Sequence, residues 1–468
     1  MKKIKVYKFV LVPALMLSMQ SCFVAKDYQR PEEIAPESTL FRTDALPQDS
    51  LSMAEVTWRE MFTDAALTSY IEKGLENNLD IRIALQQILA AQAYVKQGKA
   101  GYFPTLGAKG QVAHQQLSGN SQFGALLDGS ITEYDVTANL SWEADIWGKI
   151  RSNKRAFEAT YLQSMAAHQA VKTRLIATIA ISYYQLLALD EQKRITQETI
   201  NTRDQGLETT KALKEAGILT EVGVKQTEAQ LYTAQAILID IENEIRLLEN
   251  SVSILLGEAP RAIVRSELQS QEITTDLNIG VPVQLLQNRP DLIEAEYNLM
   301  NAFELTNVAR SNFYPSLQLT ATGGLQSLEF DKLFNVNSLF ATLVGSLTQP
   351  ILNGRRIRTE FEVSQSIQEQ AVLNFQKTLL IAGIEVSDAL YSYKANSEKI
   401  EVKSKEYEAY NQATIFSEEL LENGLANYLE VLNARENALN SRLSLVNSQF
   451  AQLKSIVDLY RALGGGWR

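Results

Sequence analysis

The stretch YDVTANLSWEAD, at residues 134–145, decides the fold because its side chains alternate between apolar and polar. Every second residue from Tyr134 to Ala144 is apolar or aromatic, and the residues between them are polar. Side chains of a strand point alternately to its two faces, whereas a helix repeats about every 3.6 residues. The stretch is therefore predicted to be a strand with one apolar and one wet face, although most of the surrounding sequence is typical of helix.

The composition is that of a folded protein. The chain has 468 residues, of which 45% are hydrophobic and 21% are charged, and this balance excludes a disordered chain. Its formal net charge of -11 argues against a nucleic-acid partner and against general adhesion to anionic lipid.

The N-terminus has the pattern of an export signal. Residues 1–21 combine a basic start, MKKIKVYK, with the short apolar run FVLVPALMLSM, and Ser21 precedes Cys22, the only cysteine. The run is too short for a membrane-spanning helix, which needs about 20 apolar residues. A lone cysteine is often only a small buried residue or a stray thiol. This placement, however, resembles the lipobox of bacterial lipoproteins, in which the thiol carries a diacylglycerol, and a lipidated Cys22 would tether the chain to a membrane.

Two long tracts are predicted to form very long helices. No proline lies between Pro104 and Pro260 or after Pro350, so both tracts lack the strongest helix breaker. A helix of about 60 residues would be about 90 Å long and would need packing partners along its length. Apolar residues at three-four spacing predict such packing, with a simple bundle or coiled-coil rod as the plain alternative. These residues are Leu231, Ala234, Leu238, Ile241, Ile245, Leu248, Val252 and Leu255, and Leu439, Leu443, Val446, Phe450, Leu453, Val457 and Tyr460.

The chain contains two copies of one unit, because three motifs recur in the same order. The pairs are FPTL at 103–106 with YPSL at 314–317, IWGKIR around Gly148 with LNGRRIR around Gly354, and EAGILTEVGV around Gly217 with ENGLANYLEV around Gly424. Each copy should therefore carry the same elements.

Each copy is predicted to contain two alternating strands, at about 105–116 and 134–145 and at about 316–326 and 339–349. A length of about 10 residues suits a tilted transmembrane strand. Four strands cannot close a barrel in lipid, but three copies would supply about twelve strands, which lies within the range of outer-membrane barrels. The alternative is a small soluble sheet packed on helices.

From Cys22 to Trp467 the sequence resembles the TolC-like outer-membrane factors, and among them the outer-membrane efflux lipoproteins of the OprM/NodT type. The motifs that carry the resemblance are YQRP at 28–31, WREMFTDAALTSYIEKGLENNLDIRIA at 58–84, WEADIWGKIR at 142–151, LLG at 255–257, NRPDLIEAE at 288–296, ARSNFYPSLQLT at 309–320 and LGGGW at 463–467. Each motif is weak alone, but their shared order on a duplicated frame is specific.

The resemblance implies a mainly α protein with a membrane β-barrel. Three copies would share one β-barrel of four strands per protomer, and long coiled-coil-like helices would form a periplasmic α-barrel. The implied function is the passive exit duct of a tripartite efflux system in the bacterial outer membrane. An inner-membrane pump, of the resistance-nodulation-division type, would deliver substrates through a periplasmic adaptor protein.

The expected domain order combines the signal, the duplication and the resemblance. It consists of a lipoprotein signal peptide at 1–21, a lipid-anchored extended segment at 22–57, a first repeat at 58–260, a linker at 261–281, a second repeat at 282–463 and a tail at 464–468.

The resemblance places a gate in the stretch GLANYLEVLNAR at 424–435. Leu429 matches the family's apolar ring, and Glu430 and Asn433 match positions at which the family carries carboxylates. Threefold symmetry would bring three copies of Glu430 together as a cation-attracting constriction. Asn433 replaces the common aspartate, and for a lone glutamate the alternative is an ordinary solvated helix residue.

The resemblance also places adaptor docking at the two glycine-centred turns that end the long helices, although such a glycine alone is equally explained as an ordinary helix C-cap. The residues are Gly217, Ile218 and Leu219 in the first copy, and Gly424, Leu425 and Ala426 in the second.

Two other classes of function remain as alternatives. The first is an enzyme, but the sequence offers few residues suited to catalysis: it has two histidines and one cysteine and lacks phosphate-binding glycine motifs. No cofactor and no metal are expected. A lipid-anchored periplasmic coiled-coil scaffold without a pore would explain the helices and Cys22 but leaves the four strands without a purpose.

Overall fold

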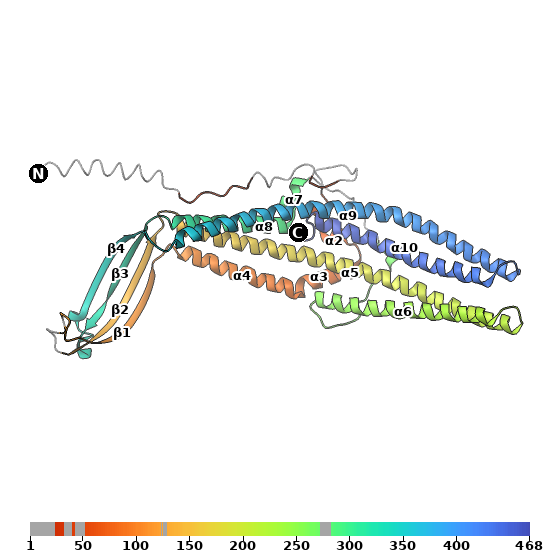
Figure 1. Cartoon of the computed structure of the whole chain (residues 1–468), viewed down its shortest axis with the longest axis horizontal. Coiled ribbons are helices and arrows are strands. Elements are labelled where there is room, and N and C mark those ends of the chain that lie inside the picture. Colours follow the sequence, from red (N-terminus) through yellow and green to blue (C-terminus); the bar gives the residue numbers. More distant parts are fainter. Residues whose placement is uncertain (1–23, 32–39, 43–51, 123, 125–128, 272–281) are drawn as a thin grey trace. The chain divides into compact units, whose positions relative to one another are not determined.

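The computed structural model describes residues 24–31, 40–42, 52–122, 124, 129–271 and 282–468. The chain divides into two compact units (Figure 1). The strand unit comprises the described residues within Met1–Pro31, Ile88–Ser164 and Ala295–Phe375, and the helix unit comprises those within Glu32–Gln87, Met165–Glu294 and Gln376–Arg468.

The strand unit contains one antiparallel sheet with the strand order β1-β2-β3-β4. Its strands are β1 (Thr105–Gln116), β2 (Ser130–Ala144), β3 (Ser316–Ser327) and β4 (Leu339–Thr348). All four lie where the alternating sequence predicts strands, although β2 begins at Ser130, before the predicted start at Tyr134.

Four helical segments accompany the sheet in the strand unit. They are the parts of α4 (Leu79–Ala100), α5 (Lys149–Glu215), α8 (Pro290–Ser311) and α9 (Arg356–Glu422) that belong to it. Tyr94 of α4 stacks on Phe157 of α5 at 5.7 Å between ring centroids. The amide of Asn301 in α8 donates to the Ala156 carbonyl in α5 at 2.9 Å.

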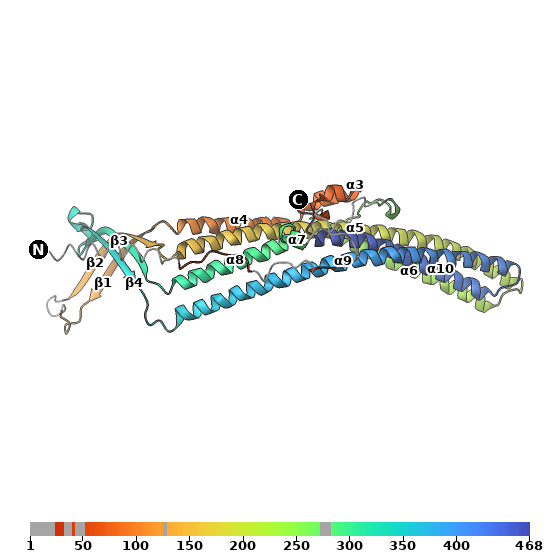
Figure 2. The same ribbon diagram turned by 90° about the horizontal axis from the view of Figure 1, so that it is seen from above.

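The helix unit is dominated by long helices that run side by side in pairs (Figures 1 and 2). The remainder of α5 lies beside α6 (Glu221–Leu255), and the remainder of α9 lies beside α10 (Tyr428–Ala462). Shorter helices complete the unit: α2 (Trp58–Met61), α3 (Ala65–Asn77), the beginning of α4, α7 (Pro282–Asn288) and the beginning of α8, with one-turn 3-10 helices η2 (Met53–Glu55) and η3 (Leu268–Ser270).

The element lengths confirm the internal duplication. Helices α4 and α8 each have 22 residues, β1 and β3 each have 12, α5 and α9 each have 67, and α6 and α10 each have 35. Gly148 and Gly354, which precede α5 and α9, both have a positive φ, of 77° and 62°. The two copies therefore share the order and most of the lengths of their elements, although β2 has 15 residues and β4 has 10.

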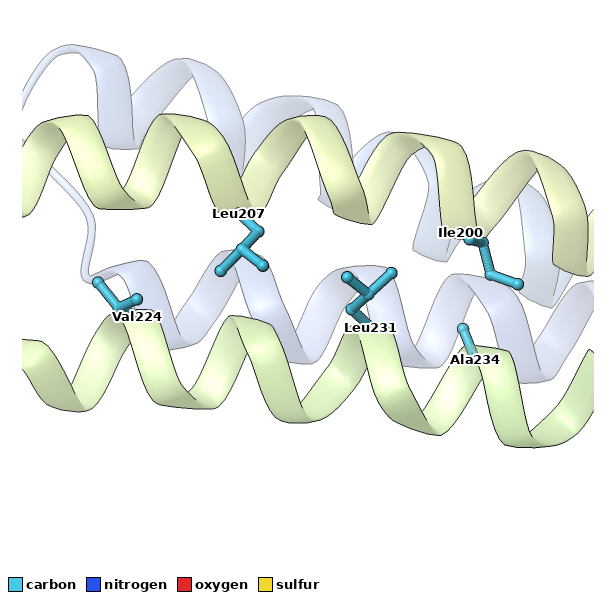
Figure 3. Packing of buried hydrophobic residues seen from close by; sticks show 5 residues of the cluster. All are labelled: Ile200, Leu207, Val224, Leu231 and Ala234. Atoms are coloured by element: carbon cyan, nitrogen blue, oxygen red, sulfur yellow. The ribbon is translucent and has the colours of Figure 1, made fainter.

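The apolar stripe at three-four spacing forms the contact between paired helices. Ile200 and Leu207 of α5 point toward Val224, Leu231 and Ala234 of α6, and all five side chains are buried (Figure 3). Removing Leu or Ile side chains from such a contact costs about 2–5 kcal/mol. The stripe predicted for α10 is likewise buried or half-buried throughout.

Among the residues that the structure describes, no helix combines the length and the apolar composition that a membrane crossing requires.

Candidate functional site

One face of the sheet is apolar. The strand register pairs Leu106 with Leu140 and Leu140 with Ala321, and residues paired in this way point to the same face. The same register places further apolar and aromatic side chains on this face: Ala108, Val112, Tyr134, Val136, Ala138, Trp142, Leu317, Leu319, Leu325, Leu339, Ala341, Leu343 and Leu347. Leu106, Leu339 and Leu343 remain 74%, 68% and 77% exposed in the single chain, so much of this face is uncovered among the described residues. An exposed apolar surface of this extent is typical of a lipid or protein contact.

The opposite face of the sheet is mainly polar, although Ile131, Phe340 and Val344 also lie on it. Asn139 accepts a hydrogen bond from Thr322 Oγ1 at 2.8 Å across β2 and β3, and Gln326 donates to Glu133 between the same strands. The register adds Lys109, Gln111, Asp135, Thr137, Ser141, Glu143, Gln318, Thr320, Thr342 and Ser346 to this face. The alternation in residues 134–145 therefore separates two environments.

Both edges of the sheet are open within the part of the chain that the structure describes. Strand β1 pairs only with β2, and β4 pairs only with β3. Unpaired backbone N–H and C=O groups along an edge are costly in an apolar medium and can pair with strands of another chain. The sheet is thus incomplete as a membrane structure until other strands join it.

The two glycine turns of the helix unit have the backbone that sequence reasoning predicts. Gly217 and Gly424 have φ values of 74° and 72°, which favour glycine over residues with a Cβ. The next residue donates its N–H back into the helix, Ile218 to the Leu213 carbonyl at 2.9 Å and Leu425 to the Leu420 carbonyl at 2.8 Å. Each long helix therefore ends in a Schellman turn.

The predicted docking residues differ in exposure. Ile218 is 73% exposed and Leu425 is 76% exposed, so both turns present an aliphatic side chain to the surroundings. Leu219 and Ala426 are only half-buried. Leu219 lies against Gly223, where an added Cβ would come within 2.9 Å of the leucine side chain.

The predicted gate residues lie together in the first turns of α10. Leu429, Glu430 and Asn433 are exposed, whereas the neighbouring Tyr428 and Val431 are buried. Asn427 caps the helix, because its side-chain oxygen accepts from the Leu429 N–H at 3.1 Å. The cap fixes the start of α10 and hence the direction of the exposed stripe.

Two polar contacts, one buried and one partly buried, join α10 to α6 near this turn. Thr227 Oγ1 donates to the Gly223 carbonyl at 3.0 Å, so the Tyr428 hydroxyl donates to Thr227 Oγ1 at 2.9 Å. The side-chain amide of Gln230 also donates to the Leu432 carbonyl at 3.2 Å. Sequence reasoning did not find these contacts, because neither partner has an unusual neighbourhood in the sequence.

Arg203 of α5 makes a third polar contact in this region and connects α5 to both α6 and α10. Its side chain is 3% exposed; Nη1 donates to the Gln230 carbonyl in α6 at 2.5 Å, and Nη2 pairs with Glu436 in α10 at 2.8 Å. A signal was available in the sequence: Ile200, Arg203 and Leu207 follow three-four spacing, so the arginine occupies a position within the apolar stripe of α5. A charged residue at such a position predicts a buried ion pair.

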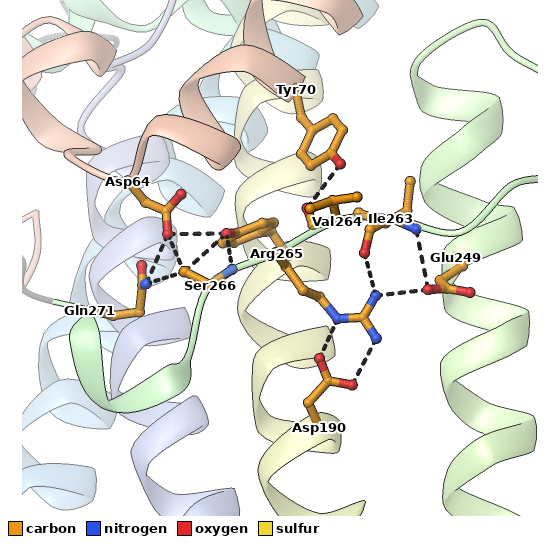
Figure 4. A network of polar contacts seen from close by, with 10 residues as sticks. Asp64, Tyr70, Asp190, Glu249, Ile263, Val264, Arg265, Ser266 and Gln271 are labelled. Carbon is orange, nitrogen blue, oxygen red and sulfur yellow. Dashed lines mark hydrogen bonds and ion pairs between the residues drawn. The ribbon is translucent and has the colours of Figure 1, made fainter.

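The segment at 261–271 holds α3, α5 and α6 of the helix unit together (Figure 4). Arg265 pairs with Asp190 of α5, with Nη2 to Oδ1 at 2.7 Å, and with Glu249 of α6 at 2.8 Å. Tyr70 of α3 donates to the Val264 carbonyl at 2.9 Å. These contacts lie within the stretch for which the sequence predicts only a linker, at 261–281.

Asp64 collects hydrogen bonds in the same network (Figure 4). Burial raises the pKa of this carboxyl, but hydrogen bonds from Ser266, the Leu67 N–H, Gln271 and Tyr183 outweigh it and hold the pKa below its ordinary value. Asp64 also caps α3, accepting from the Ala66 N–H at 2.8 Å. These hydrogen bonds thus favour the ionised form of the carboxylate.

Two further expectations from the sequence concern the lipidated cysteine and metal binding. Cys22 and the signal peptide lie outside the described residues. Within the described part of the chain, no group of three or more His, Cys, Asp or Glu side chains is arranged to hold a metal ion.

Comparison with known proteins agrees with this arrangement. The sequence pattern of the family described as "Outer membrane efflux protein" matches residues 70–258 and 281–465. The chain is 29% identical to the toluene efflux pump outer membrane protein TtgC of Pseudomonas putida, over 95% of this chain and 93% of that protein. It is 27% identical to the cation efflux system protein CusC of Escherichia coli, over 97% of each. The fold matches the outer-membrane channel OprN with a TM-score of 0.86 at 23% identity, over 95% of this chain and 100% of that one. The chain therefore belongs to the outer membrane efflux protein family.

Proposed function

We propose that three copies of this chain form the exit duct of a tripartite efflux system in the bacterial outer membrane. The duct is passive: an inner-membrane pump supplies the energy, and a periplasmic adaptor joins the pump to the duct. Family membership supports a role in efflux rather than in catalysis.

The observation that carries the proposal is the open four-stranded sheet with one apolar and one polar face. Lipid suits the apolar face, and a water-filled lumen suits Asn139, Thr322 and their neighbours. Three copies would join their open edges and supply about twelve strands, which removes every unpaired edge. A coiled-coil scaffold without a pore gives this sheet no role.

We place the gate of the duct at the beginning of α10. Leu429, Glu430 and Asn433 are exposed on one side of a helix whose other side is buried. A ring of three Glu430 carboxylates would attract cations, and a ring of three Leu429 side chains would restrict the opening. Asn433 adds no charge, so Glu430 alone carries the electrostatic part of this gate.

We place adaptor docking at the two Schellman turns. Exposed Ile218 and Leu425 follow glycines in turns that are hydrogen-bonded back to the helix, so a partner can bury them without first ordering the turn. The adaptor that fits here presents an apolar helical tip.

Membrane attachment through acylated Cys22 and a pump of the resistance-nodulation-division type complete the proposal. Both rest on the sequence resemblance. The named relatives handle chemically different substrates, toluene for one and cations for another. We propose that the pump, rather than this chain, selects the substrate.

Single-channel conductance in planar bilayers tests the duct and the gate together. The wild-type protein should show a small, cation-preferring conductance. Leu429→Ala should raise the conductance, and Glu430→Ala should lower the preference for cations. Glu401→Ala is the matched control, because Glu401 is an exposed glutamate of α9 with a side chain 71% exposed, and removing its charge should change neither quantity.

The possible outcomes separate the parts of the proposal. A stable conductance that both gate variants leave unchanged would retain the duct and contradict the gate. A well-folded protein that never conducts would contradict the duct. Docking is tested separately with Ile218→Asp and Leu425→Asp, which should abolish efflux in cells while the conductance of the purified protein stays normal.

A further inference from the structure

The connection between β3 and β4, residues 328–338, exposes large apolar side chains. Leu328, Phe330, Phe334 and Val336 are 64%, 63%, 73% and 85% exposed. Side chains of this size are usually covered in a soluble protein when several occur close together. The function proposed above does not account for them.

This connection is held in a fixed conformation. It contains two one-turn helices, η4 (Phe330–Lys332) and η5 (Val336–Ser338). Ser327 Oγ accepts from the Glu329 N–H at 3.1 Å, and Ser338 Oγ donates to the Lys332 carbonyl at 2.8 Å. Leu333 is 3% exposed and anchors the connection from inside. These contacts fix the backbone of the connection, and its large apolar side chains remain exposed in that conformation.

The connection continues the apolar face of the sheet. Phe330 packs edge-on against Tyr134 at 5.4 Å between ring centroids. Tyr134 shares its face with Val136 and Ala138, because alternate residues of β2 point the same way. Phe330 therefore lies on the apolar side and not on the side of Asn139.

Chain order fixes the end of the sheet at which this connection lies. Strand β3 begins shortly after α8 ends at Ser311, and β4 ends shortly before α9 begins at Arg356. The β3–β4 connection is therefore at the end of the sheet away from these helices. If the helices face the periplasm, this end faces the outer leaflet.

We propose that residues 328–338 form a lipid anchor, in which Phe330, Phe334 and Val336 insert among the acyl chains of the outer leaflet. The proposal rests on the membrane placement of the sheet given above. Aromatic side chains are favoured at membrane interfaces, and the Lys332–Glu329 ion pair, with Nζ to Oε1 at 2.7 Å, remains at the polar level of the head groups. The anchor would hold the outer end of each protomer at a fixed depth.

Spin labels on introduced cysteines test the anchor in the full-length protein. We would label Val336→Cys and, as its neighbour in sequence, Asn337→Cys, with Phe334→Cys as a second apolar position. The proteins are reconstituted into phosphatidylethanolamine–phosphatidylglycerol vesicles. Collision rates with molecular oxygen, which concentrates in lipid, and with a water-soluble nickel complex are then compared. Wild-type protein labelled in parallel gives the background from Cys22.

Ala138→Cys and Asn139→Cys provide the internal reference. These consecutive residues of β2 are exposed on the apolar and the polar face respectively. The anchor predicts an oxygen preference at positions 336 and 334 that approaches that of position 138, and a lower one at position 337.

Each outcome decides a different point. A nickel preference at positions 334 and 336, with an oxygen preference at 138, would overturn the anchor and leave the membrane sheet intact. Shielding of 334 and 336 from both reagents would also overturn it, because a second copy would then cover the connection. A nickel preference at both 138 and 139 would contradict the membrane sheet itself.

Discussion

At the scale of single residues, the most consequential side chain is Arg203, a buried charge within an apolar contact between helices. Its guanidinium reaches α6 through a backbone carbonyl and α10 through Glu436. Burial of an ion pair adds little net stability, but removing one partner leaves a charge without compensation. Arg203 therefore makes part of the contact between the two helix pairs depend on Glu436.

Removing Glu436 should destabilise the helix unit. For Glu436→Ala we expect a loss of about 1–3 kcal/mol, because a buried charged donor is left unpaired. The melting temperature of the purified protein in detergent measures the change. Glu401→Ala is again the matched control, since its pair with Lys405 is fully exposed to solvent and contributes little to stability.

A second variant shows whether the charge is the cause. Adding Arg203→Met to Glu436→Ala removes the unpaired charge and fills the apolar contact, so much of the lost stability should return. A double variant that melts below Glu436→Ala would show that Arg203 stabilises the unit in some other way.

At the scale of elements, a short extended segment at 24–31 is fastened to the helices of the strand unit. Asn307 of α8 bonds both backbone groups of Lys26, accepting from its N–H at 3.2 Å and donating to its carbonyl at 2.9 Å. Arg30 forms a two-pronged pair with Glu296 of α8. Burial, assisted by Glu296 and partly offset by Arg30, raises the pKa of Tyr28 to about 12, so its ring stays neutral beside Phe303.

Asn307→Leu should release this segment from α8. Amide hydrogen exchange at residues 25–29 should accelerate, because the side chain that holds the backbone of Lys26 is lost. Asn301→Leu is the control: Asn301 lies on the same helix but bonds to α5, so exchange at 25–29 should stay slow. Equal acceleration in both variants would mean that α8 itself had loosened.

The stability of the helix unit should depend on pH in the acidic range, because Asp64 holds the segment at 261–271 through its carboxylate. The folded-state pKa of Asp64 lies below its ordinary value of about 4, so its contribution to stability is present above that pH and is lost as the pH falls toward the folded pKa. Asp64→Asn should therefore lower the melting temperature at neutral pH, and the difference from wild type should shrink below about pH 4. A difference that stays constant down to pH 3 would show that ionisation of Asp64 does not matter.

At the scale of the whole molecule, duplication preserves backbone geometry while side-chain chemistry diverges. Both tips are Schellman turns, but Lys214 pairs with Glu221 across the first, whereas Asn427 caps the helix after the second. Thr220, at the corresponding cap of α6, makes no side-chain bond to that helix. The backbone of the turn is the same in both copies. The side chains around it differ, so each turn can make different contacts with a partner.

Assembly in the membrane should depend on which face of the sheet is changed. Leu319 and Thr320 are consecutive residues of β3, with Leu319 on the apolar face and Thr320 on the polar face. Leu319→Lys should reduce the yield of heat-resistant trimers in the outer-membrane fraction, because a lysine facing lipid costs up to about 2–4 kcal/mol. Thr320→Lys places the same charge on the polar face, which lines the lumen in the proposed duct, and should be tolerated. A lower yield for Thr320→Lys than for Leu319→Lys would reverse the assignment of the two faces.

The sequence by itself determined the elements of this protein, because they depend on local periodicity. Alternation over residues 134–145 is a strand signal that tertiary contacts reinforce, and absence of proline over two long tracts permits helices of 67 residues. Glycine at 217 and 424 predicted the turns for the same reason, since a positive φ is a property of one residue.

Only the tertiary structure decided which side chains meet across elements far apart in the sequence. The pairing of β2 with β3, the bond between Tyr428 and Thr227, and the network around Arg265 join residues separated by up to about 200 positions. Periodicity predicts that a face will be buried but carries no information about which other face will cover it. That choice depends on packing and hydrogen-bond geometry summed over the whole contact, and it exists only once the chain has folded.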